Sequence, residues 1–365
     1  MKRFLLKVSI FLIYAALWYT LFPMYIDPFN VFHADNIRAN GVMPNKNYIK
    51  MKYILAHPDK FNTFLFGSSR TGAIHTDRII GEQCYNMLYS TGVPRWHLEN
   101  IKTFFANKIY PDKIYIGVDS VSYTGNYAAQ VNDPSRCPYE YLISHNIHFL
   151  KLYLDPVKVF QSLNTMLSAL MGKVQVINTE AFYKYGWDIP YNHPSNIDWE
   201  DPAQVEPVFG YGKWDEGYRN YDVDIEDANI SSNVDESIDY VLNILREISD
   251  ICRKNNTELV IFTNPMHHVT YTASVREKKY FEFLEGLAEI TDFWNFSSLN
   301  DITLSNDCYR ETSHYKAKIG DLIIDIMCNG KTYPELQAQG FGVKVRRENV
   351  KDFLGMLKAQ LTPEE

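Results

Sequence analysis

An uncharged apolar run near the amino terminus is the first feature of the hydrophobic pattern. Residues 8–25 carry no charged side chain, and Lys2, Arg3 and Lys7 precede them. One helical membrane crossing needs roughly 17–25 apolar residues, and this run is about that long. Basic residues on its leading side predict that this end stays in the cytoplasm. We therefore expect an uncleaved signal anchor over residues 1–25, with a cleaved signal peptide as the alternative.

Beyond a turn-rich stalk over residues 26–60, apolar segments of strand length alternate with segments of helical spacing. The candidate strands are residues 61–66, 84–89, 113–118, 258–263 and 291–296. The candidate helices between and after them are residues 96–106, 233–253, 275–288 and 315–328. Strands separated by helices predict a parallel sheet that is covered on both faces. We expect a three-layer α/β/α sandwich with a parallel five-stranded sheet over residues 61–330.

A long insertion, residues 120–235, separates the third strand from the long helix. Its first part, residues 138–171, is apolar with helical spacing, and its second part, residues 179–221, is dense in Trp and Tyr. A loop of this length inside an α/β domain is usually a lid or a binding element. Aromatic faces beside carboxylates and amides predict stacking on sugar rings, with packing of a cap onto the body as the alternative. For the extension over residues 331–365 we expect packing or docking.

Composition narrows the classes of function. Hydrophobic residues make up 46% and charged residues 22% of the chain, which is typical of a globular protein. The net charge is −8 and no basic block exceeds a few residues, which argues against a nucleic-acid partner. The five cysteines show no CxxC spacing, so we expect neither a metal nor a redox cofactor. Cysteines that look free, in a chain that is predicted to be exported, are consistent with a protein of the bacterial cell envelope.

Two short strings carry the candidate chemistry. In the first, residues 64–71, an apolar run breaks at a glycine and presents Ser68 and Ser69. In the second, Glu311 stands three residues before His314, just ahead of an apolar helix. Together they supply a hydroxyl nucleophile, a base and a carboxylate that orients the base. The alternatives are serines that only form a turn and a carboxylate that only caps the helix.

Further polar residues are expected at the same edge of the sheet. Ligands of open parallel sheets bind at the carboxyl ends of the strands, where the first candidate strand delivers its serines. Arg70, Asp119, His267 and His268 follow three of the candidate strands and are possible substrate-binding residues. Arg70 suits an anionic group such as a phosphate or a uronate, with a structural ion pair as the alternative.

Combined, the two strings resemble the SGNH (GDSL-like) hydrolase superfamily. The closer likeness is to its membrane-anchored cell-envelope branch, which includes the D-alanine transfer protein of teichoic-acid synthesis and the alginate O-acetylation proteins. The block Gly67-Ser-Ser-Arg70 falls where that family has its nucleophile, so the resemblance implies Ser69 in this role, with Ser68 as the alternative register. It also implies a flavodoxin-like topology.

The other blocks of the family extend the resemblance. The final Asp-x-x-His block matches Glu311 and His314, with glutamate in place of the usual aspartate. Gly92 best matches the glycine that donates to the oxyanion hole, together with the N–H of Ser69. Where the family has an oxyanion-binding asparagine, this chain has Asp119. A carboxylate facing a developing oxyanion would raise the barrier, so Asp119 must point elsewhere, be protonated or bind something different.

The resemblance implies an extracytoplasmic, serine-dependent O-acyltransferase or esterase that acts on a cell-envelope glycopolymer. It further implies a single-pass protein of the bacterial cell membrane and a membrane-bound O-acyltransferase partner that exports the acyl group. Asp119 motivates a second hypothesis, a non-catalytic, membrane-anchored scaffold subunit that binds polymer in an envelope-modification complex. A plain lipase-like esterase is a third.

Overall fold

Within the described residues, six strands form one mixed sheet. The computed structural model describes residues 1–35, 37, 41–133, 135–144, 153–171, 180–186 and 234–361. The strands are β1 Thr63–Phe66, β2 Cys84–Asn86, β3 Lys113–Val118, β4 Glu258–Thr263, β5 Phe293–Asn295 and β6 Val343–Val345. They lie in the order β2-β1-β3-β4-β5-β6. The direction of winding reverses between β1 and β3, as in doubly wound α/β sheets.

The prediction of a purely parallel, five-stranded sheet is wrong at one edge. Strands β1 to β5 are parallel, but β6 pairs antiparallel with β5 through Phe293↔Val345 and Asn295↔Val343. Just before β6 the chain passes through Gly340 and Gly342, whose φ angles of 89° and 72° favour glycine. Residues of the predicted carboxyl-terminal extension therefore contribute a strand to the sheet.

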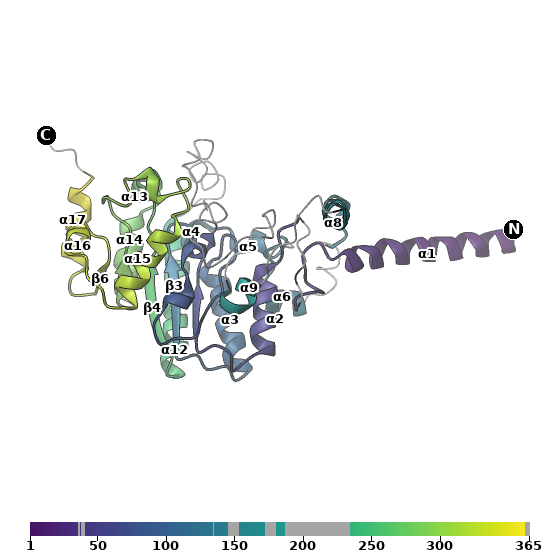
Figure 1. Ribbon diagram of the computed structural model, residues 1–365, viewed down its shortest axis with the longest axis horizontal. Helices are drawn as coiled ribbons and strands as arrows, with labels where there is room; N and C mark the ends of the chain where they lie inside the picture. Colours follow the sequence, from purple (N-terminus) through teal and green to yellow (C-terminus); the bar gives the residue numbers. More distant parts are fainter. Residues whose placement is uncertain are drawn as a thin grey trace. The chain divides into compact units, whose positions relative to one another are not determined.

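Helices make up most of the regular secondary structure of the described residues (Figure 1). The α-helices are α1 Lys2–Ile26, α2 Lys46–Ala56, α3 Pro94–Ala106, α4 Val121–Thr124, α5 Tyr127–Gln130, α6 Tyr139–Ser144, α8 Pro156–Leu170, α9 Glu180–Tyr185, α12 Val234–Lys254, α13 His268–Glu277, α14 Tyr280–Ala288, α15 Ala317–Met327, α16 Pro334–Ala338 and α17 Val350–Ala359. The 3₁₀ helices are η1 Ser69–Ala73, η2 Thr76–Arg78 and η4 Asn306–Cys308. The predicted aromatic segment, residues 179–221, lies outside the described residues apart from 180–186.

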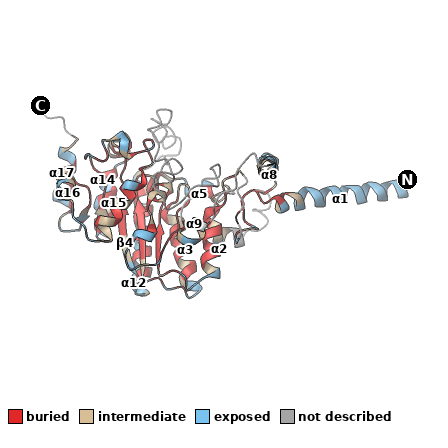
Figure 2. Ribbon diagram, in the orientation of Figure 1, coloured by how far each residue is buried: buried red, intermediate tan, exposed pale blue. Residues whose placement is uncertain are grey.

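One face of the sheet is covered by α3 and α12. Side chains of a strand alternate between the two faces, so Phe64 and Phe66 of β1 point the same way. Their rings lie 4.6 and 6.0 Å from the ring of Phe104 in α3. The amphipathic α12 packs beside α3, and its expected apolar residues are buried: Ile238, Val241, Leu242, Leu245 and Ile248. Figure 2 shows the strands as the most deeply buried layer.

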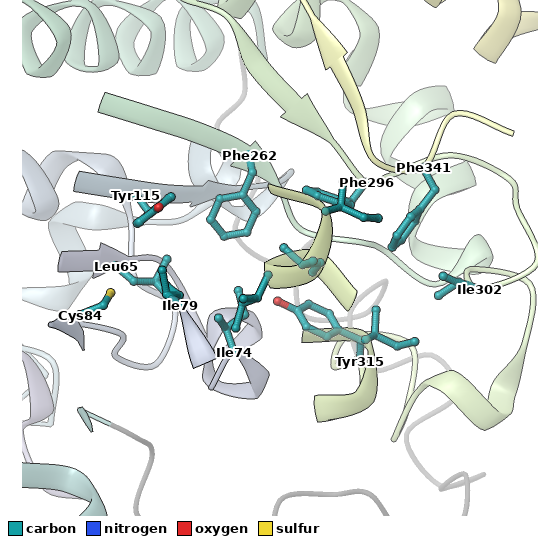
Figure 3. Close-up of a cluster of buried hydrophobic side chains, with 14 of the residues drawn as sticks. Leu65, Ile74, Ile79, Cys84, Tyr115, Phe262, Phe296, Ile302, Tyr315 and Phe341 are labelled. Atoms are coloured by element: carbon teal, nitrogen blue, oxygen red, sulfur yellow. The ribbon is translucent and has the colours of Figure 1, made fainter. Parts of the chain in front are cut away.

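The opposite face is covered by α15 and η1. Leu65, Tyr115 and Phe262 project from three neighbouring strands into a cluster of buried side chains that includes Ile74 (Figure 3). Ile319, Ile323 and further apolar residues of α15 complete this cluster. The same packing therefore holds η1, which begins at Ser69, and α15, which follows His314, on one face of the sheet.

The described residues divide into two compact units. One unit contains the described residues among Met1–Tyr53 and Ala128–Thr179, and the other those among Ile54–Tyr127, Glu180–Asp188 and Ile197–Glu365. The sheet belongs to the second unit. The first part of the predicted insertion therefore groups with the amino-terminal segment, and not with the sheet that precedes it in the chain.

In the first unit, α1 is long and apolar enough to cross a membrane, although a signal sequence has the same properties. It has 25 residues and a mean hydropathy of 1.8 over its most apolar window. The helix ends at Ile26, and its C-cap Asp27 has a left-handed backbone with φ 53°. The buried carboxylate of Asp27 accepts hydrogen bonds from the N–H groups of Val31 and His33 at 2.9 and 2.8 Å. This turn fixes the start of the stalk.

The free side of β2 is approached closely by another segment of the second unit. Gly186 follows α9 with φ 74°, and a side chain at this position would collide with the backbone of Asn86 in β2. The hydroxyl of Thr76 in η2 donates to the carbonyl oxygen of Tyr185 at 3.2 Å. The end of α9 is thereby fixed against this edge of the sheet.

His97 of α3 links stability to pH. It is 1% exposed, its ring lies 5.4 Å from that of Phe66, and among the described residues neither ring nitrogen has a hydrogen-bond partner. Burial lowers the pKa of His97 from 6.5 to about 3. Below about pH 6.5 the unfolded chain binds a proton that the folded protein excludes, so stability falls as the pH falls toward 3.

We expect this residue to contribute a slope of about 1.4 kcal/mol per pH unit between pH 6 and pH 4. His97→Leu removes the titrating group, so its free energy of unfolding should decline less steeply over this range. Urea unfolding of both proteins in detergent, at a series of pH values, measures the two slopes. Parallel slopes would contradict the assignment.

Candidate active site

Ser69 and Ser68 have different surroundings although they are adjacent. β1 ends at Phe66, and Ser68 is the N-cap of η1, where its Oγ accepts from the backbone N–H of Arg70 at 3.3 Å. Ser68 is 5% exposed, whereas Ser69 is half-buried at the start of the helix. The hydroxyl of Ser68 is therefore engaged in capping the helix, whereas the hydroxyl of Ser69 takes no part in this cap.

His314 lies against Ser69. The Nε2 atom of His314 is 2.8 Å from the Oγ atom of Ser69. A short antiparallel bridge between Tyr309 and Tyr315 presents the intervening residues as a loop just before α15. Within it, the N–H of Arg310 donates to the carbonyl oxygen of His314 at 2.9 Å. The structure therefore brings together the two residues from opposite ends of the predicted domain.

Glu311 is fixed behind the imidazole. Its Oε2 accepts from the N–H of Ser313 at 2.6 Å, and its Oε1 accepts from the N–H of His314 at 3.1 Å and contacts Nδ1 of the same residue. Because a carboxylate only accepts, Nδ1 carries the proton and Nε2 accepts from the Ser69 hydroxyl. These backbone N–H groups hold the longer side chain of glutamate in place. Ser69, His314 and Glu311 are therefore in contact one after another.

A glycine permits the approach of the two strings. Gly320 of α15 packs on the carbonyl group of Ala73 in η1, where an added Cβ would collide with backbone atoms, and it would stand 3.1 Å from the Cα of Ile74. The helix that follows His314 therefore lies directly on the helix that begins with Ser69. This close approach brings η1 and the start of α15 together, and with them Ser69 and His314.

Arg70 and Asp119 form a buried ion pair. The Nη1 atom of Arg70 lies 2.7 Å from Oδ1 of Asp119, and both side chains are 2% exposed. The Nε atom of Arg70 donates to the carbonyl oxygen of Ser313 at 3.1 Å. The structural ion pair weighed for Arg70 is thus what the structure contains, and this burial does not offer the guanidinium to a substrate anion. Asp119 points to Arg70, one of the three alternatives left open for it.

Asn264 and Tyr315 extend the pair into a network that the sequence analysis missed. The Nδ2 atom of Asn264 donates to Oδ2 of Asp119 at 2.9 Å, and the Tyr315 hydroxyl donates to Oδ1 of Asn264 at 3.2 Å. In the sheet, Val118 of β3 pairs with Thr263 of β4. The residues that follow these two are Asp119 and Asn264, so strand register was the signal that could have placed them together.

Gly92 is close to Gly67, two residues before Ser69, but its N–H already donates a hydrogen bond. An added Cβ on Gly92 would collide with the carbonyl oxygen of Gly67, which explains the glycine. Its N–H donates to the carbonyl oxygen of Tyr89 at 3.1 Å, within a turn. The expected oxyanion role of Gly92 would require that this bond be exchanged. Ser69 begins a helix, where N–H groups have no intrahelical acceptor.

His267 is the N-cap of α13, and His268 is the first residue of this helix. The Nδ1 atom of His267 accepts from the N–H of Val269 at 3.4 Å, and its Nε2 lies 3.0 Å from Oδ1 of Asn306. Burial lowers the pKa of His267 to about 4, so it is neutral at neutral pH. In the parts of the chain that the structure describes, no three His, Cys, Asp or Glu side chains converge as metal ligands would.

Comparisons with protein-family models, with curated proteins and with solved structures found no match to this chain. The chemistry of the site is therefore argued from its geometry.

The Arg70–Asp119 pair should dominate the stability of this edge. Asp119→Asn leaves a buried guanidinium without its carboxylate, so we expect a loss of about 3–5 kcal/mol in the free energy of unfolding. Arg70→Met should cost a similar amount, because it leaves a buried carboxylate. The double variant should be more stable than either single variant, since both charges are gone.

Urea unfolding in detergent measures these differences. Arg347→Met is the matched control, because Arg347 forms an exposed ion pair with Glu289 at 2.8 Å, and such pairs contribute little. Equal effects of Asp119→Asn and Arg347→Met would show that the buried pair has no special weight.

Proposed function

We propose that this chain is a serine-dependent O-acyltransferase or esterase with an acyl-serine intermediate. The observation that carries the proposal is the 2.8 Å separation of Ser69 Oγ from His314 Nε2, with Glu311 on the other imidazole nitrogen. A serine hydroxyl is a weak nucleophile unless an adjacent base takes its proton, and this arrangement supplies that base. Ser69 and His314 are both partly exposed, as a site that binds an acyl donor requires.

In the first half of the reaction, Ser69 Oγ attacks the carbonyl carbon of an acyl donor while its proton passes to His314 Nε2. Glu311 holds the resulting imidazolium in place and compensates its charge. The tetrahedral intermediate collapses when the C–O bond to the leaving group breaks, and His314 returns the proton to that oxygen. The N–H of Ser69 is the proposed donor to the oxyanion, with Gly92 as the second donor if its turn opens.

In the second half, an acceptor hydroxyl attacks the acyl-Ser69 ester. His314 takes the proton of this hydroxyl and delivers it to Ser69 Oγ as the ester bond breaks. A sugar hydroxyl as acceptor gives an O-acylated polymer, and water gives hydrolysis. The same three side chains serve both outcomes.

The setting that we propose is the outer side of a bacterial cell membrane, with an envelope glycopolymer as the substrate. The support is α1, which is long and apolar enough to cross a membrane, together with the basic residues before it. The resemblance to the SGNH hydrolase superfamily, which rests on the two matching blocks, is a further support. The doubly wound strand order agrees with the topology that this resemblance implies. A membrane-bound O-acyltransferase is the proposed partner, because acyl donors are cytoplasmic and the group must cross the membrane.

Labelling with a fluorophosphonate tests the nucleophile in the full-length protein. We expect covalent labelling of wild type at Ser69 and none in Ser69→Ala. Ser68→Ala is the matched control, since its hydroxyl caps η1, and it should still be labelled. His314→Ala and Glu311→Gln should slow both labelling and acetyl-ester turnover by roughly 10²–10⁴-fold.

Labelling that survives in Ser69→Ala would remove Ser69 as the nucleophile. Absence of labelling in wild type, together with binding of the envelope polymer, would instead favour the non-catalytic scaffold. Turnover of a broad panel of acyl esters without transfer to sugars would favour the plain esterase.

A further inference from the structure

The outer face of α8 is apolar and exposed. Positions 157, 160, 164, 167 and 171 repeat at intervals of three and four residues, so they share one side of the helix. Four of these five residues are apolar: Val157, Phe160, Leu167 and Met171, with Asn164 as the exception. Phe160 is 67% exposed and Met171 60%, and the neighbouring Leu170 is 84% exposed. A helix that turns such residues outward needs an apolar environment there.

The inner side of α8 is fixed to its own unit, so the helix cannot turn its apolar face inward. Val159 and Ser162 are buried. The side-chain amide of Gln161 donates to the carbonyl oxygen of Gly41 at 2.7 Å, and the side chain of Thr165 packs on the same glycine. The outward direction of the apolar side is therefore set by these contacts.

α8 also contacts α1, the helix that is apolar enough to cross a membrane. The hydroxyl of Tyr19 in α1 donates to the carbonyl oxygen of Leu154, one residue before the N-cap Asp155 of α8, at 3.5 Å. In Figure 1, α8 is seen nearly end-on while α1 runs across the picture, so the two axes cross. A helix that lies along a membrane surface has this relation to a helix that spans it.

The level of this contact along α1 fits the membrane interface. Tyr19 stands seven residues before Ile26, the last residue of the helix, which is about 10 Å at 1.5 Å per residue. Trp18, Tyr19 and Tyr25 are exposed aromatic residues near this end, and Trp and Tyr concentrate at the level of the headgroups. The first turn of α8 is thus at the level where the lipid headgroups would lie.

We propose that α8 is an interfacial membrane helix. Its apolar side enters the boundary between headgroups and acyl chains, in the leaflet that contains the carboxyl end of α1. Its polar side stays on the protein. Amphipathic helices bind in this way with their apolar face buried about 5–10 Å. The inference rests on α1 as the membrane-crossing segment and is independent of the acyl-transfer chemistry. A phospholipid bilayer is the occupant that the continuity with α1 favours.

Site-specific photocrosslinking of the full-length protein tests this. The photoreactive amino acid p-benzoylphenylalanine replaces one residue at a time, at Phe160 and at Leu167, in vesicles of phosphatidylethanolamine and phosphatidylglycerol. After irradiation we expect the protein to gain the mass of one phospholipid at both positions. Leu12 in α1 is the positive control. Tyr110, an aromatic residue of the other unit that is 59% exposed, is the matched control and should gain none.

Lipid adducts at Leu12 but not at Phe160 or Leu167 would overturn the inference. Absence of an adduct at Leu12 would refute the membrane crossing by α1 and, with it, the inference that rests on it. Crosslinking of Phe160 to another protein in native membranes would reassign this face as a protein-docking surface and also overturn the proposal. Fluorophosphonate labelling of Ser69 is unaffected by any of these results, so the two proposals fail separately.

Discussion

The arrangement of the candidate site depends on one buried charge. Arg70 follows Ser69 in the chain and its side chain is buried, so its positive charge must be compensated by a carboxylate and by hydrogen bonds. Asp119 supplies the carboxylate from the end of β3, and the carbonyl oxygen of Ser313 accepts from Nε. Because Ser313 is adjacent to His314, this side chain also holds the loop that carries His314. The ends of β1 and β3 and the histidine loop are therefore joined by a single side chain.

This network gives a physical reason for the aspartate at position 119. The charge of the buried Asp119 carboxylate is compensated by Arg70, and its second oxygen accepts from the amide of Asn264. The arginine that follows the serine and the aspartate that follows β3 are thus coupled. Substitution of one is expected to require substitution of the other.

The parallel strands, and the placement of Ser69 at their carboxyl ends, could be predicted from the sequence because each depends on strong local patterns. Buried strands such as Lys113–Val118 are apolar runs, and the rule that parallel strands end at one edge places Ser69 there. β6 could not be found in this way, because it has only three residues with Lys344 at the centre. The burial of Arg70 was equally hidden, since its partner comes from a different strand. The turn that engages the N–H of Gly92 is a local hydrogen-bonding choice that spacing does not reveal.

The two margins of the sheet have a consequence for how copies of the chain can meet. Unpaired strand edges invite pairing between molecules, and confinement to a surface would increase such encounters. At one margin, β6 is very short and carries a lysine, and at the other, the backbone at Gly186 crowds β2. Among the described residues, neither margin offers a long flat template for intermolecular sheet extension. Pairing of these two edges between copies of the chain is therefore disfavoured, which matters most for a protein whose copies are concentrated on one surface.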